Sequence, residues 1–229
     1  MREIVLDTET TGFDAKGTDR IVEIGCVELI NHIPSGEDFH VYINPERDMP
    51  QAAFEVHGLS TEFLSDKPLF ADVAQGFIDF IQDSLLVIHN APFDVGFLNA
   101  ELERVNMPLL TNDRVLDTLA LARRKHPGAQ NSLDALCRRY NIDNSARDKH
   151  GALLDSEILA LVYSELIGGH QAFLNLNGPG QSGSGARAKR PETSPRPNAL
   201  PSRISEDEAV AHKAFIETMG EKALWNKFS

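Results

Sequence analysis

Two acidic residues, two positions apart, stand at the end of a short apolar run near the start of the chain. The run covers residues 4–6, and the acids are Asp7 and Glu9. Successive side chains of a strand point to opposite faces, so Asp7 and Glu9 should point the same way, with Thr8 opposite. Paired carboxylates supply the oxygen ligands that hard divalent cations prefer. The alternative is a strand end with solvated acids, so a metal site needs further ligands from elsewhere in the chain.

A third acid follows the next fully apolar run. Residues 85–88 predict a strand buried on both faces, and Asn90, Pro92 and Asp94 come directly after it. Asn90 is typical of a helix N-cap, and proline is tolerated in the first turn, where no backbone donor is lost. Asp94 should therefore lie in the first turn of a helix just beyond a strand end. An acid at that position could also simply stabilise the helix dipole.

A histidine and a fourth acid mark the start of a helix predicted over residues 152–167. They are His150 and Asp155. At about 100° per residue, five helical positions would separate the two side chains by about 140°, so both could not face one metal ion from a regular helix. We therefore expect His150 in the preceding loop and Asp155 pointing inward from the second turn. An ordinary cap or surface histidine is the alternative.

The elements that must position these residues follow an α/β order. Strands are predicted at 20–30 and 39–43, joined across a turn at 34–36, and they would form an antiparallel set with the first strand. A short helix should run from Pro50 to His57, where Gly58 suits a left-handed cap. The remaining predictions are helices at 68–82, 117–125 and 131–140 and a strand at 114–116.

Composition limits the classes of protein. The chain has 229 residues, of which 41% are hydrophobic, enough for one domain and an appendage. No apolar run reaches the ~18 residues of a membrane span, and the first residues do not resemble a signal segment. Cys26 and Cys137 form neither a disulfide framework nor a metal spacing. These features predict a cytoplasmic protein.

Charge and composition divide the chain into three parts. Residues 1–177 carry 14 Lys and Arg against 28 Asp and Glu, residues 178–204 five against one, and residues 205–229 three against five. An acidic body argues against a broad duplex-binding surface but allows a metal-loaded cleft that receives a strand end. Of the 27 residues in 178–204, 13 are Gly, Pro or Ser, which predicts a flexible linker. Ser205 and the acids after it predict the start of a C-terminal helix.

Taken together, the three acidic sites resemble the motifs of the DEDDh 3′–5′ exonucleases. Those motifs read D-x-E, N-x-x-F-D and H-x-x-x-x-D, and they occur here in that order at residues 7–9, 90–94 and 150–155. The resemblance covers about residues 1–167 and implies a ribonuclease H-like mixed five-stranded sheet flanked by helices. Val56 and His57 match a family segment that contacts the terminal nucleotide.

The resemblance also implies a reaction. Two divalent ions, Mg²⁺ or Mn²⁺, would promote phosphodiester hydrolysis, with Asp7 bridging them and Glu9 and Asp155 completing the tighter site. Asp94 would serve the looser ion through water, and His150 would accept a proton from the attacking water. Asp7, Glu9 and Asp155 would thus also contact the substrate. A frayed, mispaired 3′ end would enter most readily and leave as a 5′-monophosphate.

No basic residue lies within the three motifs themselves. We therefore expect that removing Asp7 or Asp155 abolishes activity while relieving like-charge repulsion. Either variant should then melt at a higher temperature than the wild type when metal is absent.

Within the family, the resemblance is strongest to the proofreading (epsilon) subunits of bacterial DNA polymerase III. It implies a polymerase (alpha) subunit that buries Trp225 and Phe215 of the C-terminal segment, and it leaves open a small theta-like subunit. Residues 171–176 are similar to a sliding-clamp (beta) binding peptide, with Gln171, Leu174 and Leu176 as contacts. Alternatively, Phe173 and Leu176 pack on the preceding helix.

Two other functions fit parts of the sequence. A stand-alone oligoribonuclease-like enzyme that trims RNA would have the same acids but no use for the tail. A non-catalytic replication adaptor would have the tail but no use for the acids.

Overall fold

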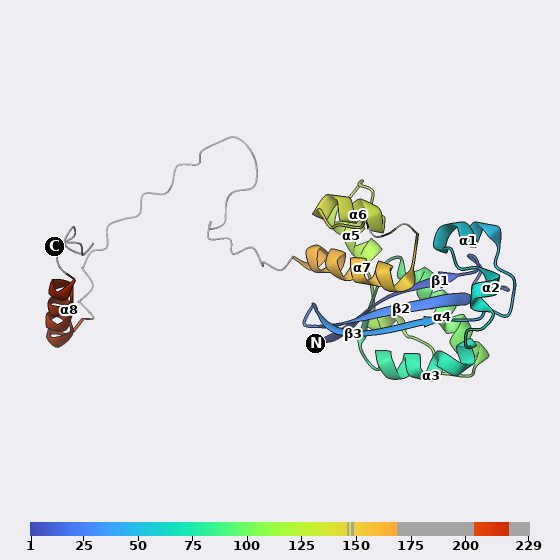
Figure 1. Cartoon of the computed structure of the whole chain (residues 1–229), viewed down its shortest axis with the longest axis horizontal. Coiled ribbons are helices and arrows are strands. Elements are labelled where there is room, and N and C mark those ends of the chain that lie inside the picture. The colour runs from blue at the N-terminus through green and yellow to red at the C-terminus, as the bar shows by residue number, and fades with distance from the viewer. Residues whose placement is uncertain (146, 148, 169–203, 220–229) are drawn as a thin grey trace. The chain divides into compact units, whose positions relative to one another are not determined.

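The computed structural model describes residues 1–145, 147, 149–168 and 204–219 (Figure 1). They belong to two units, 1–176 and 177–229, each of which is described by itself. The clamp-like segment 171–176 and Trp225 lie outside the described residues.

The body is built on a mixed five-stranded sheet with the strand order β3-β2-β1-β4-β5. β1 (Arg2–Thr10) is central and pairs antiparallel with β2 (Ile21–Ile30), which pairs antiparallel with β3 (Ile33–Tyr42). β4 (Leu85–Ile88) runs parallel to β1, and β5 (Val115–Asp117) runs parallel to β4. The α/β class and the five-stranded mixed sheet predicted from the sequence are confirmed.

The turn between β2 and β3 differs from the prediction. It lies at Asn31 and His32, whose φ angles are 52° and 67°, and not at residues 34–36. Two successive left-handed residues match the twist of a tight hairpin, and asparagine tolerates that conformation well. Pro34 lies inside β3, which is an edge strand and can accept a residue without a backbone donor.

Helices cover both faces of the sheet (Figure 1). α3 and α4 lie on one side, whereas α7, with α5 and α6 beyond it, lies on the other. The short helix α2, which begins after the N-cap Ser60, was not predicted. α4 begins where predicted, and the body helices for which both limits were predicted begin and end within two residues of them. The helices of the body are α1 (Gln51–His57), α2 (Thr61–Leu64), α3 (Phe70–Ile81), α4 (Ala91–Arg104), α5 (Thr118–Lys125), α6 (Leu133–Tyr140) and α7 (Ala152–Ile167), with a 3-10 turn at Asn112–Arg114 before β5.

Alternation along β1 assigns its residues to these two layers. Ile4 and Leu6 belong to the apolar cluster built with α3 and α4, while Val5 belongs to the cluster built with α7. Asp7 and Glu9 share the parity of Val5, and Thr8 shares that of Leu6. The paired acids are therefore on the face covered by α7, and Thr8 is on the face covered by α4.

Gly25 allows α7 to approach the sheet closely. A Cβ atom built on Gly25 would lie 2.2 Å from the backbone carbon of Ala152 and 2.2 Å from the nitrogen of Leu153. Ser156 reinforces the contact, since its hydroxyl donates a 2.9 Å hydrogen bond to the Gly25 carbonyl. Gly25 is also the cross-strand partner of Asp7. The first turn of α7 is thereby fixed directly beside the acidic end of β1.

The described part of the second unit is α8 (Glu206–Thr218). Ser205 caps it as predicted, accepting a hydrogen bond from the Glu208 nitrogen while the Glu208 carboxylate bonds the Ser205 nitrogen. Val210 and Phe215 are exposed on α8. None of the helices in the described ranges has the length and apolar character needed to cross a bilayer.

Candidate active site

The acidic end of β1 opens into a cleft of about 1480 Å³. All five side chains singled out in the three motifs line it, namely Asp7, Glu9, Asp94, His150 and Asp155. Glu9, Asp94 and Asp155 are buried, and Asp7 is partly exposed. Residues that are distant in the sequence thus come together in one cleft at one end of the sheet.

Asp94 reaches β1 from the opposite layer. It lies in the first turn of α4, as predicted, and its Oδ1 accepts hydrogen bonds from the backbone nitrogen of Thr8 at 3.1 Å and from the Thr8 hydroxyl at 2.7 Å. Asn90 occupies the N-cap position, as predicted, with a left-handed backbone (φ 69°) and no side-chain cap hydrogen bond. The contact with Thr8 fixes the Asp94 carboxylate at the strand end.

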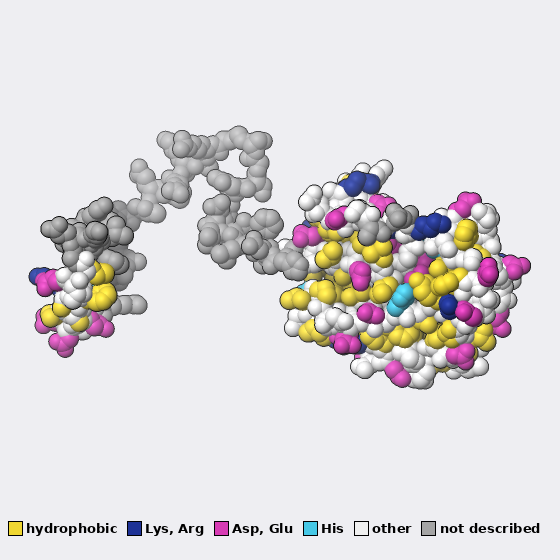
Figure 2. Space-filling view, in the orientation of Figure 1, with side chains coloured by type: hydrophobic (Ala, Val, Ile, Leu, Met, Phe, Trp, Pro, Cys, Tyr) yellow, Lys and Arg dark blue, Asp and Glu magenta, His cyan; other side chains and the backbone are white. Residues whose placement is uncertain are grey.

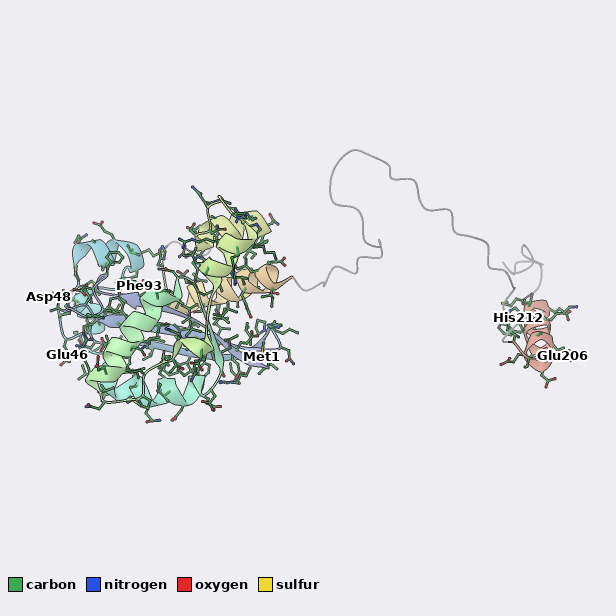
Figure 3. The ribbon with its side chains drawn as sticks, turned by 180° about the vertical axis from the view of Figure 1, so that it is seen from behind. Met1, Glu46, Asp48, Phe93, Glu206 and His212 are labelled. Atoms are coloured by element: carbon green, nitrogen blue, oxygen red, sulfur yellow. The ribbon has the colours of Figure 1, made fainter. Side chains whose placement is uncertain are left out.

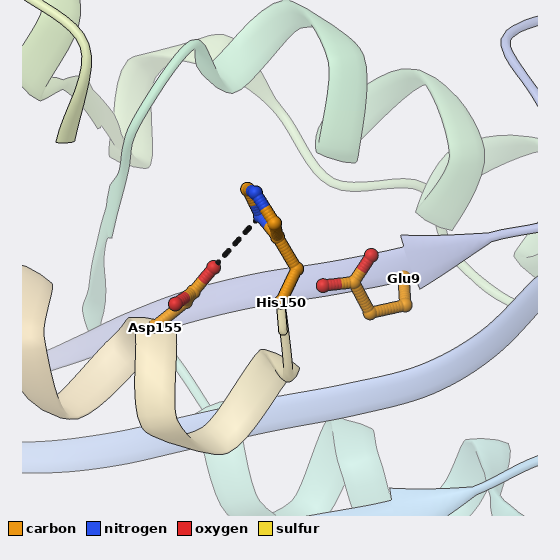
Figure 4. Close-up of side chains that lie close together, drawn as sticks. All are labelled: Glu9, His150 and Asp155. Carbon is orange, nitrogen blue, oxygen red and sulfur yellow. Dashed lines mark ion pairs between the residues drawn. The ribbon is translucent and has the colours of Figure 1, made fainter. Parts of the chain in front are cut away.

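His150 lies in the loop before α7, as predicted. Asp155 points inward from the first turn of α7 and not from the second. His150 Nδ1 is 3.2 Å from Asp155 Oδ2, and ligand atoms of Glu9, His150 and Asp155 all lie within 4.8 Å of one another (Figure 4). The turn of backbone between loop and helix therefore brings both side chains to the same spot.

Arg147 is the residue that sequence reasoning missed most clearly. Its guanidinium forms an ion pair with Asp155, donates to Asp155 Oδ2 at 2.6 Å, and contacts His150 Nδ1 at 2.7 Å and Asp134 Oδ1 at 2.8 Å. Asp155 therefore has a cationic partner that lies outside the three motifs, so its charge is compensated in a way that the motifs alone did not indicate. Arg147 precedes His150 by only three residues, and that proximity in the sequence was the available signal.

Burial and mutual repulsion control the ionisation of the acids. Burial, followed by the charges of Asp94, Glu9 and Asp155, raises the pKa of Asp7 well above its usual value. Burial and the neighbouring carboxylates also raise the pKa of Glu9 to about 8, and burial raises that of Asp94 to about 7. Asp155 differs, because burial is outweighed by hydrogen bonds from His150 and Arg147, which lower its pKa. Three of the four carboxyls are thus costly to ionise without a cation.

Helix α1 forms another wall of the cleft. His57 is buried, and its Nδ1 accepts a hydrogen bond from the Leu59 nitrogen at 3.0 Å, while its Nε2 is buried without a hydrogen-bond partner among the described residues. Val56 is 45% exposed, and its carbonyl accepts a 3.2 Å hydrogen bond from the His150 nitrogen. α1 and the histidine loop are therefore joined directly.

An exposed aromatic ring, that of Phe13, lies at the cleft, and its role was not predicted from the sequence. Phe13 is 90% exposed, lines the cleft and meets Phe93 edge-on at 6.1 Å. Figure 3 shows Phe93 at the end of the body near α1, with Met1 at the opposite end. An aromatic face in this position offers a nucleobase a stacking surface.

The donor set fits divalent cations. The carboxylate oxygens of Asp7, Glu9, Asp94 and Asp155 are hard ligands. The raised pKa values of Asp7, Glu9 and Asp94 indicate that the protein alone compensates the charge of these three acids poorly. The imidazole of His150 can act as a general base beside them. Chemically, the arrangement suits the metal-assisted hydrolysis of a phosphate ester.

Comparison with known proteins gives one consistent family. The family model described as Exonuclease (RNase_T) matches residues 4–163. DNA polymerase III subunit epsilon from Rickettsia prowazekii (strain Madrid E) is 48% identical over 221 residues, which cover 95% of this chain and 96% of that protein. The subunit from Salmonella typhimurium (strain LT2) is 45% identical over 239 residues, covering 98% and 97%.

Solved structures agree with this result. Exonuclease X in complex with 5′ overhanging duplex DNA is 28% identical, with a TM-score of 0.56 over 72% of this chain and 90% of that one. The nuclease domain of 3′hExo, a DEDDh family member bound to rAMP, has a TM-score of 0.63 over 72% and 91%. Its identity is 18%, so it supports the fold alone.

Proposed function

This chain belongs to the exonuclease family that includes the epsilon subunits of DNA polymerase III, and we propose that Asp7, Glu9, Asp94, His150 and Asp155 carry its reaction. The chain is a divalent-metal-dependent 3′–5′ exonuclease that proofreads within DNA polymerase III. The proposal adds that two ions, Mg²⁺ or Mn²⁺, act in the cleft and that the product is a nucleoside 5′-monophosphate.

The observation that carries the proposal is the convergence of these five side chains in one cleft. Four carboxylates from two strand-end positions and two helix starts surround a single space, and one histidine faces it from a loop. When bound there, the cations would make water a better nucleophile and offset charge on the phosphoryl oxygens. Such an arrangement has little use in a purely structural domain, where buried acids would cost stability.

Each side chain has a role that follows from its place. Asp7, Glu9 and Asp155 lie on the α7 side and would hold the cations. Asp94, which Thr8 fixes from the α4 side, would complete the set of carboxylates that hold them. His150 is 49% exposed at its side chain, so it can accept a proton from an attacking water and release it to solvent.

The terminal nucleotide would lie against α1. Val56 offers an exposed apolar surface, and the buried Nε2 of His57 lacks a partner that a nucleotide oxygen could supply. Phe13 would stack on a base. A frayed end reaches these contacts without the cost of breaking good pairs, which favours mispaired termini.

Association with DNA polymerase III carries further proposals about the chain's organisation. We assign residues 1–177 to the exonuclease domain, 178–204 to a linker and 205–229 to a segment that binds the polymerase (alpha) subunit through Phe215 and Trp225. Gln171, Leu174 and Leu176 would bind the sliding clamp (beta). The charge and composition of these segments support the division, and cytoplasmic location follows from the proposed role.

The test is digestion of 5′-labelled DNA that carries a paired or a mispaired 3′ end. We expect a ladder that shortens by single nucleotides, faster removal of mispaired ends, 5′-monophosphate products and full inhibition by EDTA. His150→Gln should lower kcat by roughly 10²–10⁴-fold. Internal cleavage, or a His150→Gln variant as fast as the wild type, would contradict the proposed roles.

A further inference from the structure

The cleft is strongly acidic, although its proposed substrate is a polyanion. On the face of the body shown in Figure 2, acidic side chains are scattered widely and Lys and Arg are sparse. Seven carboxylates line the cleft, and the arginines and lysines among its lining residues are Arg123 and Arg147. The lining carboxylates are Asp7, Glu9, Asp14, Asp19, Asp94, Asp134 and Asp155. Cations at the metal site would offset the charge at the scissile phosphate, but phosphates further along the strand need another partner.

Arg147 is already neutralised. It lies between Asp155 and Asp134 and is almost fully buried at its side chain. Arg123 is different: it is exposed on α5, and within the described residues it has no hydrogen bond or ion pair. On the same helix, Lys125 is engaged, since it donates to the carbonyl oxygens of Glu165 and Leu166. Arg124 is exposed and, among the described residues, has no hydrogen bond or ion pair either, but it does not line the cleft. Arg123 is therefore the unpaired cation of the cleft wall.

The surroundings of Arg123 are polar and fixed. His89 lines the same wall, with its Nδ1 2.9 Å from the Thr118 hydroxyl. Asn131, also on this wall, is buried and donates to the carbonyl oxygens of His126 and Ala129. His89 and Asn131 are thus held by hydrogen bonds, whereas the Arg123 side chain is exposed and has no such partner among the described residues.

Arg123 also marks an edge of the cleft. It lines both the cleft and a shallow hollow beside β5, whereas Arg124 lines only the hollow. Since the terminal nucleotide is assigned to the α1 wall, the remainder of the strand has to leave along another wall, and α5 supplies one that bears a cation. Charged side chains that follow the backbone are the usual means of holding single-stranded DNA without reading its sequence.

We propose that Arg123 binds a DNA phosphate upstream of the scissile bond, which makes it a substrate-positioning residue. This inference rests on the proposed function, since it uses the same cleft and the same strand direction. An arginine suits the position because its planar fork can contact two phosphate oxygens at once.

The experiment compares Arg123→Ala with Arg124→Ala, the adjacent cation on the same helix. Single-stranded oligonucleotides of three or more residues are digested in Mg²⁺ at several salt concentrations. Arg123→Ala should raise KM roughly 5–20-fold, change kcat less, and make the salt dependence of binding shallower by about 0.7 in the log–log slope. Arg124→Ala should resemble the wild type. Arg123→Lys should restore the salt dependence but only part of the affinity, because an ammonium group cannot contact two phosphate oxygens in the same way.

A second substrate separates failure of this inference from failure of the proposed function. An aryl ester of thymidine 5′-monophosphate has the terminal nucleotide but no upstream phosphate, so the two alanine variants should hydrolyse it alike. A wild type that cleaves neither the ester nor DNA would overturn the proposed function. Equal KM values for Arg123→Ala and Arg124→Ala on DNA would overturn the role of Arg123, as would a loss that is just as large on the ester.

Discussion

Asp7 and Asp155 face the same cleft, but their surroundings act on them in opposite ways. Burial and the neighbouring acids raise the pKa of Asp7, whereas hydrogen bonds from His150 and Arg147 lower the pKa of Asp155. Ionised Asp7 therefore destabilises the metal-free folded state, while ionised Asp155 is compensated by its partners. The two acids have related roles in the proposed reaction and opposite effects on stability.

Replacing Asp7 with Ala should raise the melting temperature of the metal-free protein, and replacing Asp155 with Ala should lower it. Removing Asp155 would leave Arg147 almost buried without its main partner, at a cost of about 1–3 kcal/mol. The sequence alone predicted a gain for both variants, and the ion pair with Arg147 reverses that expectation for Asp155. Thermal melts in EDTA measure the stabilities.

Both variants should lose more than nine-tenths of the wild-type rate on labelled DNA in Mg²⁺. Asp83→Ala, which removes an exposed acid after α3, is the control and should change neither the rate in Mg²⁺ nor the melting temperature in EDTA. An Asp155→Ala protein that melts higher in EDTA than the wild type would refute the importance of the Arg147 pair.

The raised pKa values also predict how pH changes stability. In the metal-free folded protein, burial raises the pKa of Glu9 to about 8 and that of Asp94 to about 7, from ordinary values of 4.5 and 3.8. Folding therefore binds protons, and the stability from these groups, complete below about pH 4, is lost as pH rises through about 7–8. Cations bind the deprotonated carboxylates, so metal binding should release protons.

The gain in melting temperature on adding Mg²⁺ should consequently be small near pH 6 and clearly larger near pH 8.5. Differential scanning fluorimetry with and without Mg²⁺ across that range measures it. Glu9→Gln removes one of the titrating groups and should flatten the metal-free pH dependence. A gain that is the same at every pH would show that the acids are already ionised in the metal-free protein.

The residues of the site divide by how well the sequence could reveal them. Asp7, Asp94 and Asp155 could be placed because each follows a strand or opens a helix, and local patterns predict such positions well. The Thr8 contact to Asp94 and the Arg147 contact to Asp155 depend on how the layers and one loop meet in space. Local sequence periodicity therefore could not predict these two contacts.

At the scale of elements, the position of α7 depends on Gly25. The helix start touches the backbone of β2 at the site of the missing side chain, and this contact determines where Asp155 and His150 lie. Gly25→Ala should force α7 away from the sheet, which we expect to cost about 1–3 kcal/mol. Displacing Asp155 by even about 1 Å should lower kcat by roughly 10²-fold.

Gly76→Ala in α3 is the matched control. A Cβ atom there would have Phe39 at 3.8 Å as its nearest neighbour, an ordinary contact, and alanine favours a helix interior. This control should keep full activity and gain up to about 1 kcal/mol of stability. Urea denaturation and kcat on a short oligonucleotide measure both variants. Equal behaviour of the two would mean that α7 does not need the close approach.

The order of the helices and strands could be predicted far better than the turns that connect them. Apolar periodicity located the strands and all but one of the helices of the body, because each element buries one face or both. The β2–β3 hairpin was misplaced because Pro34 and Gly36 look like a turn, whereas the actual turn uses Asn31 and His32. Proline is tolerated in a strand at the edge of a sheet. Whether a strand lies at the edge depends on the tertiary structure, so the local sequence could not indicate it.

At the scale of the whole molecule, stability and polymerase binding should separate along the chain. The three apolar clusters of the described structure use residues between Ile4 and Leu166, so the body holds its own core. α8 contributes no buried residue, and an isolated helix of its length is marginal in water. Its exposed Phe215, at 62%, has the character of an anchor that a partner buries.

Truncation after Asn177 should therefore leave a folded nuclease that no longer binds the polymerase subunit. The body should melt within a few degrees of the full chain and digest single-stranded DNA at a similar rate, because the whole proposed site lies within it. In the full chain, Phe215→Ala should weaken polymerase binding at least 10-fold, since a buried aromatic anchor can be worth 2 kcal/mol or more. Lys213→Ala on the same helix is the control and should bind nearly as well as the wild type. Co-purification tests whether the truncated body binds polymerase, and titration by fluorescence anisotropy measures the affinities of the two point variants. If the truncated body binds polymerase as tightly as the full chain, the polymerase contact lies on the exonuclease domain instead.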